Sequence, residues 1–584
     1  MAAFDLVLRN GVVVDGTGLP RRRADVAITG GRIAEIGYVD GRGARELDVE
    51  GRVVAPGIVD PHTHYDPQLT FEPYATSSCY HGVTTVVAGN CGFSVAPLRP
   101  GDADWLIQLF SRVEGMDASA LAGIPFDGFE TFPEYLRSLD GRIGVNAAFY
   151  VGHCAVRRYV MGDACQEREA TDDEIAAMAA VVADAMAAGA AGFSSSHSPT
   201  HFDAAGRPVP SRLASIAELE RLVEAAGRSA RGGSIAYLPL SAVGGITPDD
   251  EALLTRLSLS ARLPVIIQGL GARSKVDAPT AGWENAKRFV DEASERGAAV
   301  YSLVMSKPFN RTFDLAHGTS LFEGALEFHQ MFTDAPTVQA RIALLRDAAF
   351  RDRIRGSVDN PNRDPAKGPT LPPPHWDNVY VSRVSRPEND KFVGRSMVDI
   401  AAELGTHPTD ALVDLALSED LTTEFVWRTE TPEWIDGTRI AQADPHMVVG
   451  TSDGGAHLDR DDGAESHSYF LRYWVREWAG FTLEEGVRQI TALPAALTGL
   501  IDRGLLLPGF AADVYVFDPD TVGPGRKEFV HDFPNGAGRW SSKPDGAFAT
   551  IVNGVPVVLD GELQQDAGLP GRVLRPNQPA AVTA

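Results

Sequence analysis

Two histidines lie one residue apart at the end of an apolar run, in the segment PGIVDPHTHYD (residues 56–66). Side chains of a β-strand alternate between its two faces, so His62 and His64 point to the same side. Two imidazoles on one face can bind a divalent metal ion such as Zn²⁺, which also accepts thiolate and carboxylate ligands. The alternative is a pair of hydrogen-bonded histidines without a chemical role. Further ligands near this segment would decide between the two.

Eight apolar runs of strand length recur along the chain, and most gaps between them have a helical period. One such gap, residues 171–189, has Thr171 as a predicted N-cap and Gly189 as a helix stop. Eight alternating units predict an α/β protein with a (β/α)₈ TIM barrel. The runs are 57–64, 82–92, 145–153, 190–197, 234–240, 264–270, 298–306 and 447–455.

Active residues of such a barrel come from the carboxyl ends of its strands. The first run ends with His62 and His64, the second with Cys91, and the eighth contains Asp453. Strands one, two and eight are neighbours when the barrel closes, so these four side chains are expected to converge. A metal ion there would lower the pKa of a water ligand to about 7. Asp453 could then accept the proton while the water attacks a carbonyl group, and pass it to the leaving nitrogen.

Both ends of the chain consist of short strands separated by Asn-Gly and Gly-Gly turns. We expect them to form one small β-sandwich domain, with residues 1–56 as its first part and 503–584 as its second. The barrel would then span 57–502. The connection between the seventh and eighth runs is too long for a loop, which predicts an inserted subdomain or lid at about 307–446.

The composition is ordinary for a soluble globular protein. The 584 residues carry a formal net charge of −25, which disfavours nucleic acid and anionic membranes as partners. No apolar run approaches the roughly 20 residues of a membrane helix, and the N-terminus lacks the pattern of a secretory signal. Four cysteines are too few for a disulfide scaffold. We therefore expect a cytoplasmic enzyme with a small-molecule substrate; a homo-oligomer is possible.

Several segments together resemble one protein family. They are VVAPGIVDPHTHYD, HGVTTVVAGNCGFSVAP, VGHCAVRRYVMG, AAGFSSS, VGTSDGGAH and the closing TALPAALTGLIDRGLLLPGFAADVYVFDP. This order of motifs is similar to the amidohydrolase superfamily, in particular its N-acyl-D-amino-acid deacylase (D-aminoacylase) branch. The resemblance covers most of the chain and is weakest across residues 200–300 and the long insertion. It implies a metal-dependent barrel beside a small β-domain.

By this resemblance, His62 and His64 are metal ligands, Cys91 is the cysteine ligand of the branch, and Asp453 is both ligand and general base. The chain also departs from the family. No histidine ends the fifth and sixth runs, the fourth run has no lysine, and Lys275 lies too far along to replace the lysine that helps hold the substrate carboxylate. We therefore expect one Zn²⁺ ion, or another divalent metal, rather than two ions.

The remaining candidates concern the substrate. Arg157 and Arg460 could each pair with a substrate carboxylate, or could simply be solvated. Four histidines could contact the substrate, although each could also be a packed core residue: His153, His197, His201 and His457.

These features together predict a metal-dependent amidohydrolase. It would cleave the C–N amide bond of a small N-acyl compound, with an N-acyl-D-amino acid as the expected substrate. One alternative is hydrolysis of a cyclic amide or an ester by the same machinery. Another is a non-catalytic barrel that binds a partner after losing part of its metal site.

Overall fold

The computed structural model describes residues 2–241, 246–268, 283–308, 310–319, 321–364, 367–369, 372–430, 432–458, 461 and 463–576. The chain divides into two compact units. The main unit comprises Met1–Lys307 and Asp436–Ala584, and the inserted unit comprises Pro308–Ile435. The domain boundaries given above stay a prediction, and each unit is described by itself.

The main unit contains a parallel sheet of eight strands whose order along the sheet follows the order in the chain. Each predicted run supplies one strand, although the first strand ends at Asp60, before His62. The strands are β6 (Ile58–Asp60), β7 (Val83–Ala88), β8 (Asn146–Gly152), β9 (Gly192–Ser196), β10 (Ser234–Leu238), β11 (Val265–Gln268), β12 (Val300–Val304) and β16 (Met447–Val449).

The first and last strands of this sheet meet just beyond their carboxyl ends. Thr63 forms a parallel β-bridge with Gly454, and the His64 amide donates to the Gly454 carbonyl over 2.8 Å. The Asp453 amide donates to the His62 carbonyl over 3.2 Å. A curled parallel sheet with these contacts is consistent with a (β/α)₈ barrel.

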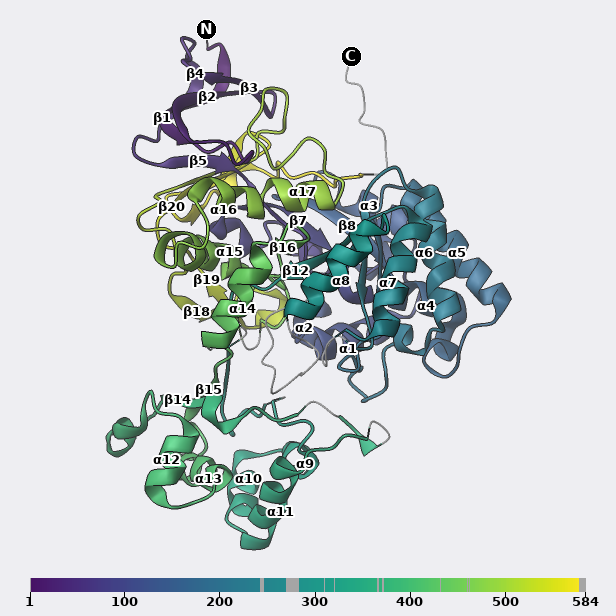
Figure 1. The fold of residues 1–584 in the computed structure, drawn as a ribbon, viewed down its shortest axis with the longest axis vertical. Coiled ribbons are helices and arrows are strands. Elements are labelled where there is room, and N and C mark those ends of the chain that lie inside the picture. The colour runs from purple at the N-terminus through teal and green to yellow at the C-terminus, as the bar shows by residue number, and fades with distance from the viewer. Residues whose placement is uncertain are drawn as a thin grey trace. The chain divides into compact units, whose positions relative to one another are not determined.

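Helices lie on the outside of this sheet, as Figure 1 shows for α4 to α8. Helix α5 illustrates how the sequence sets their limits, because the Thr171 side chain caps its first turn and Glu174 completes a capping box. The helices are α1 (Ala103–Val113), α2 (Ala118–Leu121), α3 (Phe132–Leu139), α4 (His153–Met161), α5 (Asp172–Ala187), α6 (Ile216–Ser229), α7 (Pro248–Ala261), α8 (Trp283–Glu295), α15 (Ser466–Tyr469), α16 (Leu483–Ile490) and α17 (Ala492–Leu497). A π-helix, Phe470–Glu477, continues α15.

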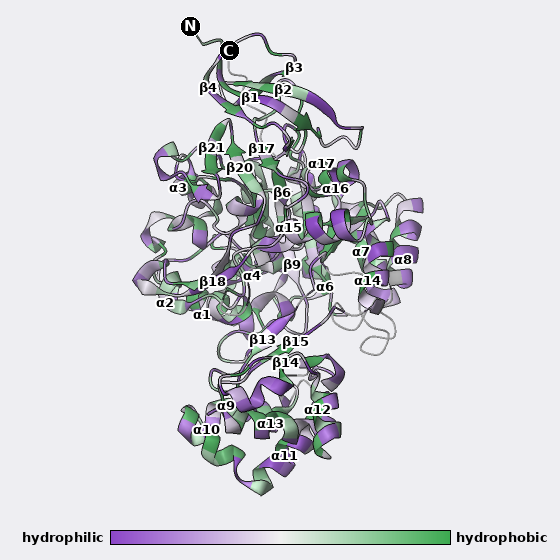
Figure 2. Ribbon diagram, turned by 90° about the vertical axis from the view of Figure 1, so that its left-hand side faces the viewer, coloured by the Kyte–Doolittle hydropathy of each residue, from purple (hydrophilic) through white to green (hydrophobic). Residues whose placement is uncertain are grey.

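Strands from both chain ends pair in a second, nine-stranded sheet, in the order β22-β21-β20-β17-β5-β1-β2-β3 with β4 on β1. Figure 2 shows hydrophobic residues along β17 and β20, whose side chains join a buried core. The strands are β1 (Phe4–Val13), β2 (Arg22–Thr29), β3 (Arg32–Gly37), β4 (Gly43–Asp48), β5 (Val53–Pro56), β17 (Val514–Phe517), β20 (Ala547–Val552), β21 (Val555–Leu559) and β22 (Glu562–Leu563). Strands β18 (Lys527–Val530) and β19 (Arg539–Ser542) form a separate pair.

The inserted unit has a hydrophobic core of its own, which includes Phe322, Phe328 and Phe425. Its sheet has the order β13-β15-β14. The strands are β13 (Arg311–Phe313), β14 (Val379–Arg383) and β15 (Glu424–Trp427), and the helices are α9 (Leu326–Asp334), α10 (Val338–Leu345), α11 (Ala348–Asp359), α12 (Met397–Leu404) and α13 (Pro408–Ser418). Helix α14 (Pro432–Gln442) crosses the boundary between the units.

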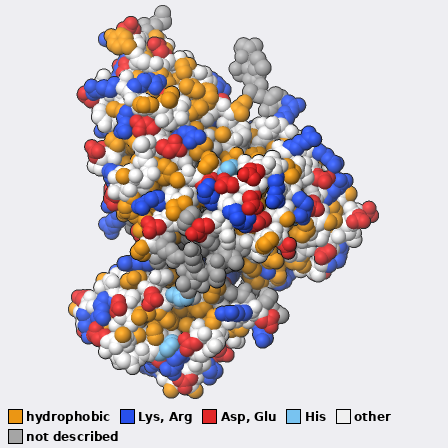
Figure 3. All heavy atoms as spheres, in the orientation of Figure 1, with side chains coloured by type: hydrophobic (Ala, Val, Ile, Leu, Met, Phe, Trp, Pro, Cys, Tyr) orange, Lys and Arg blue, Asp and Glu red, His pale blue; other side chains and the backbone are white. Residues whose placement is uncertain are grey.

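The surface mixes both signs of charge. Figure 3 shows acidic and basic side chains interspersed over one face of the molecule. Among the described helices, none combines the length and the low charge that crossing a membrane requires.

Candidate metal centre

Three side chains from two neighbouring strand ends meet at the carboxyl edge of the parallel sheet. One donor atom each of His62, His64 and Cys91 lies within 4.8 Å of the others, and all three residues are buried. The His62 Nε2 atom is 3.6 Å from Cys91 Sγ. The two imidazole rings face each other edge-on, with centroids 5.4 Å apart. Two nitrogens and a sulfur in this spacing are ligands that Zn²⁺ takes.

Asp453 joins this group from the other end of the sheet. Its Oδ1 atom lies 3.3 Å from His62 Nε2 and 3.8 Å from His64 Nε2. The backbone contacts beyond β6 and β16 described above bring these residues together. Asp453 is also the more open member, with 15% of its side chain exposed against 5% for His62 and 2% for His64. A carboxylate in this place can contact both an ion and a bound molecule.

The backbone holds two of these residues in a conformation that L-amino acids rarely adopt. Cys91 has a φ of 56° and Asp453 a φ of 54°. Such a left-handed conformation costs on the order of 1 kcal/mol and is concentrated at functional sites. Gly89 begins the turn that carries Cys91, and a Cβ atom there would come within 2.4 Å of the Tyr150 carbonyl oxygen. The GNCG motif therefore needs glycine for close packing.

A buried carboxylate that the sequence analysis did not identify lies beside His64. Glu114, at the C-cap of α1, is 3% exposed, and its Oε1 atom lies 3.4 Å from His64 Nδ1. Carboxylates that face the second nitrogen of a metal-binding histidine fix its orientation. The sequence offered one weak signal, since an acidic residue at a helix C-terminus is electrostatically unfavourable.

Gln268, the last residue of β11, was also missed. Its Nε2 donates to Asp453 Oδ1 over 3.2 Å, and its Oε1 accepts from Cys91 Sγ over 3.5 Å. The rule that selected the other residues, a polar side chain at the carboxyl end of a buried strand, would have found it. The absence of histidine from the sixth run drew attention away from this glutamine.

Burial shifts the acid–base properties of the group. It lowers the pKa of His62 to about 4 and holds the pKa of His64 well below its usual value. Both imidazoles are thus neutral near pH 7, as metal binding requires. Burial, followed by the Asp453 charge, raises the pKa of the Glu114 carboxyl well above its ordinary value. Burial also raises the pKa of the Cys91 thiol, and Glu114 and Asp453 add to that shift.

These features fit a divalent cation. Neutral imidazoles supply lone pairs, and the acidic groups beside them repel one another until a positive charge is added. A second group with metal-ligand spacing, Asp291, Asp444 and His446, differs in this respect. There the Lys287 ammonium binds Asp291 over 3.0 Å and Asp444 over 2.5 Å, so the chain provides its own cation.

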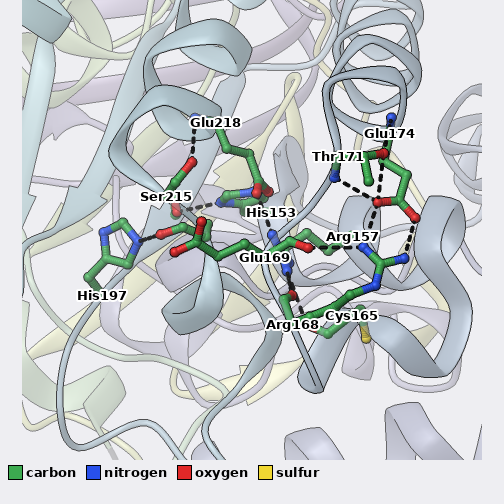
Figure 4. A network of polar contacts seen from close by, with 12 residues as sticks. His153, Arg157, Cys165, Arg168, Glu169, Thr171, Glu174, His197, Ser215 and Glu218 are labelled. Carbon is green, nitrogen blue, oxygen red and sulfur yellow. Dashed lines mark hydrogen bonds and ion pairs between the residues drawn. The ribbon is translucent and has the colours of Figure 1, made fainter.

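His153 lies at the end of β8 but not in the metal centre. Figure 4 shows it in a polar network in which its Nδ1 contacts Ser195 Oγ at 2.8 Å and its Nε2 contacts Glu218 Oε1 at 2.9 Å. Arg157 donates to the other Glu218 oxygen. The side chains of His153, Arg157 and Glu218 are 0% exposed. Ser195, His153 and Glu218 are ordered like a catalytic triad, but burial leaves no access for a substrate.

Three further histidines were predicted to contact the substrate. Both ring nitrogens of His197 have partners, Tyr237 Oη at 2.6 Å and the Ala214 carbonyl at 3.1 Å. His201 contacts Ser196 Oγ at 2.9 Å, and the pKa of His201 falls to about 3 because of burial, with smaller effects of Arg212 and His62.

The backbone amide of the remaining histidine, His457, donates to the Glu114 carbonyl over 2.5 Å. The charge of His457 also contributes to the lowered pKa of His64. Arg460 and Lys275 lie outside the described residues.

The comparisons with known proteins show the family of the chain. The model of the amidohydrolase family matches residues 45–558. D-aminoacylase of Alcaligenes xylosoxydans xylosoxydans is 31% identical over 559 residues, which are 95% of this chain and 94% of that protein.

Two solved structures are also similar. A D-aminoacylase whose binuclear metal centre has been studied has a TM-score of 0.64 and 26% identity, covering 98% of this chain and 100% of its own. An N-acyl-D-glutamate deacylase from Bordetella bronchiseptica, complexed with zinc and a phosphonate inhibitor, has a TM-score of 0.63 and 27% identity, covering 98% and 99%.

A parallel sheet with histidines and acidic groups at its carboxyl edge is typical of metal-dependent hydrolases. The chain belongs to the amidohydrolase family. It is a hydrolase that acts on carbon–nitrogen bonds other than peptide bonds.

Proposed function

We propose that this chain is a metal-dependent deacylase of N-acyl amino acids, with N-acyl-D-amino acids as its substrate class. The relatives named above support this, since they are a D-aminoacylase and an N-acyl-D-glutamate deacylase. In this proposal the eight-stranded sheet closes as a complete (β/α)₈ barrel, and the two chain ends form a small β-sandwich around the nine-stranded sheet.

The observation that carries the proposal is the convergence of His62, His64, Cys91 and Asp453 from three different strand ends. We propose that these residues hold one divalent ion, Zn²⁺ by preference because of its nitrogen and sulfur donors. When bound, such an ion lowers the pKa of water and polarises a carbonyl oxygen. Glu114 fixes the orientation of His64 from the opposite ring nitrogen.

Asp453 is the proposed general base. Its carboxylate contacts both imidazoles and is the most exposed of the three side chains, so a water molecule can reach it. It would accept the proton from the attacking water and deliver it to the leaving nitrogen. His153 and His197 have structural roles in this proposal, because both ring nitrogens of each are engaged.

Arg212 contacts His201, whose pKa is affected by His62 of the centre, and its positive charge suits a substrate with a carboxylate. Arg212 is half-buried, its guanidinium lies 4.5 Å from the Phe202 ring, and it donates to the His201 carbonyl over 3.2 Å. Burial lowers the pKa of Arg212. No carboxylate among the described residues pairs with it, although buried charges are normally paired. We propose that Arg212 binds the substrate carboxylate on the His201 side of the centre.

Activity assays on purified protein test the function. We expect hydrolysis of N-acetyl-D-amino acids and loss of activity after the metal is removed by a chelator. Hydrolysis of hydantoins or lactones instead would favour the cyclic-amide or ester alternative. Protein without bound metal, unaffected by Asp453→Asn in every assay, would favour a non-catalytic binding module.

Arg212→Met tests the substrate contact separately. A charge-assisted hydrogen bond contributes about 1.5–3 kcal/mol, so KM for an N-acyl amino acid should rise about 10- to 100-fold. The matched neutral substrate, in which an amide replaces the carboxylate, should show no such change. An equal loss for both substrates would contradict the proposed contact.

A further inference from the structure

Gln268 connects three strand ends through one side-chain amide. It ends β11, whereas its partners Cys91 and Asp453 follow β7 and β16. Its amide nitrogen donates to Asp453 Oδ1 over 3.2 Å, and its amide oxygen accepts from Cys91 Sγ over 3.5 Å. A neutral residue thus bridges the two non-histidine members of the candidate centre.

Cys91 and Asp453 therefore each contact two other residues. His62 Nε2 lies 3.6 Å from the sulfur and 3.3 Å from Asp453 Oδ1, and we call these contacts the imidazole side. The same two atoms contact the Gln268 amide, and we call these contacts the amide side. The imidazole side offers lone pairs to a cation. The amide side presents an N–H group to Asp453, and an amide nitrogen is a donor that cannot ligate a cation.

Among the described residues, the two strands that precede β11 end without an imidazole whose ring nitrogens are both available to a cation. Strand β10 ends at Leu238, before Pro239 and Leu240. His197, beyond β9, has both ring nitrogens in hydrogen bonds with Tyr237 and Ala214. Among the residues that the structure describes, the group with metal-ligand spacing at this edge is His62, His64 and Cys91.

We infer that Gln268 occupies the position where a second ion would bridge Cys91 and Asp453, and that it makes this a one-ion centre. This inference rests on the proposed function, because it presupposes an ion on the imidazole side. Gln268 is a positioning residue: its amide takes the place of a second cation and keeps Asp453 aligned with His62 and His64.

Metal counting tests the inference without relying on activity. The wild-type protein and Gln268→His are loaded with excess Zn²⁺, freed of unbound metal by gel filtration and analysed for zinc per chain. We expect about one ion in the wild type and about two in Gln268→His, because an imidazole beside Cys91 and Asp453 completes a second donor set.

The controls separate a new site from adventitious binding. Gln489→His places a histidine at a buried glutamine of α16 far along the chain from these ligands, and its zinc content should equal that of the wild type. Circular dichroism checks that each variant is folded. If Gln268→His does not fold, calorimetric zinc titration of the wild type decides the question by its stoichiometry alone.

The outcomes distinguish this inference from the proposed function. A wild-type protein that binds two ions overturns the role of Gln268 and leaves the deacylase proposal intact. A folded Gln268→His that still binds only one ion also overturns it. A wild-type protein that binds none at all overturns the proposed function itself, and the inference with it.

Discussion

Two buried polar clusters of the main unit lie at carboxyl ends of the same parallel sheet, and they differ in the charges that surround their histidines. In the first, His153, Arg157 and Glu218 are 0% exposed, and both Glu218 oxygens have hydrogen-bonded partners. In the second, Glu114 Oε1 lies 3.4 Å from His64 Nδ1, and burial holds the pKa of this imidazole well below its usual value, so it carries no positive charge near pH 7. Burial, followed by the Asp453 charge, raises the pKa of Glu114 there.

The difference shows which buried cluster carries its own counter-ion. Arg157 supplies the positive charge that Glu218 needs, and this ion pair links α4 to α6; we call this group the closed cluster. The second cluster gathers acidic groups around neutral imidazoles and becomes favourable when a cation is added. The charge of the groups around the histidines, rather than the presence of histidine, distinguishes the candidate site from the closed cluster.

The largest expected effect is a loss of activity, and it concerns Asp453 of the candidate metal centre rather than a residue of the closed cluster. Asp453→Asn should lower kcat/KM by about 10²- to 10⁴-fold, since it removes the proposed general base. The thermal midpoint should change little, because the asparagine keeps the shape of the side chain. Steady-state kinetics with an N-acetyl-D-amino acid measure the effect. A loss smaller than about threefold would contradict the role of Asp453.

Disrupting the closed cluster should lower the free energy of unfolding and leave the metal centre unchanged. Glu218→Gln leaves the Arg157 guanidinium buried without its counter-ion, which should cost about 3–5 kcal/mol of unfolding free energy. Urea denaturation measures it, and the metal content per folded chain should stay the same. Glu224→Gln, in the exposed pair with Arg228 on the same helix, should cost less than about 1 kcal/mol. Equal losses would show that Glu218 is not specially placed.

A bound ion should stabilise one cluster only. At a free concentration 100 times its dissociation constant, Zn²⁺ should add about 2.7 kcal/mol to the unfolding free energy. The increment should vanish in His64→Ala and persist in His153→Gln, even though His153→Gln is less stable overall. Paired melting curves with zinc and with chelator measure it. Persistence of the increment in His64→Ala would place the ion elsewhere.

The smallest effect concerns pH. Burial lowers the pKa of both His62 and His197 to about 4. The unfolded chain therefore binds more protons than the folded chain between about pH 6.5 and pH 4, and stability should fall as the pH falls through this range. His197→Gln should flatten this dependence with and without metal. When metal is bound, stability should fall more steeply as the pH falls, because protonation of the ligands releases the ion. His62→Gln should also remove this additional loss of stability.

That pH prediction depends on knowing which histidines are buried, and the sequence indicated this only in part. The eight strand positions and the N-cap at Thr171 followed from local periodicity and capping chemistry, which depend on nearby residues. The approach of Asp453 to His62 followed from the order of strands in a barrel. The hydrogen bonds of His153 could not be predicted from the sequence, because its partner Glu218 lies on a helix 65 residues further along the chain.

Glu114 and Gln268 are two residues of the candidate site that were not predicted from the sequence. Each is a common residue type without a motif around it, and each became significant only through its contacts with His64, or with Cys91 and Asp453. Hydrogen-bond geometry between distant segments is fixed by packing, since the same glutamine on an exposed strand end would have no partner at all.

Residue type and local spacing encode the strand order, the paired imidazoles, the cysteine and the late aspartate, so these could be predicted from the sequence. Tertiary packing settles which buried histidines have both ring nitrogens engaged and which lie beside acidic groups. The cost of a buried polar atom depends on its partners in space, and those partners come from strands and helices far apart in the chain.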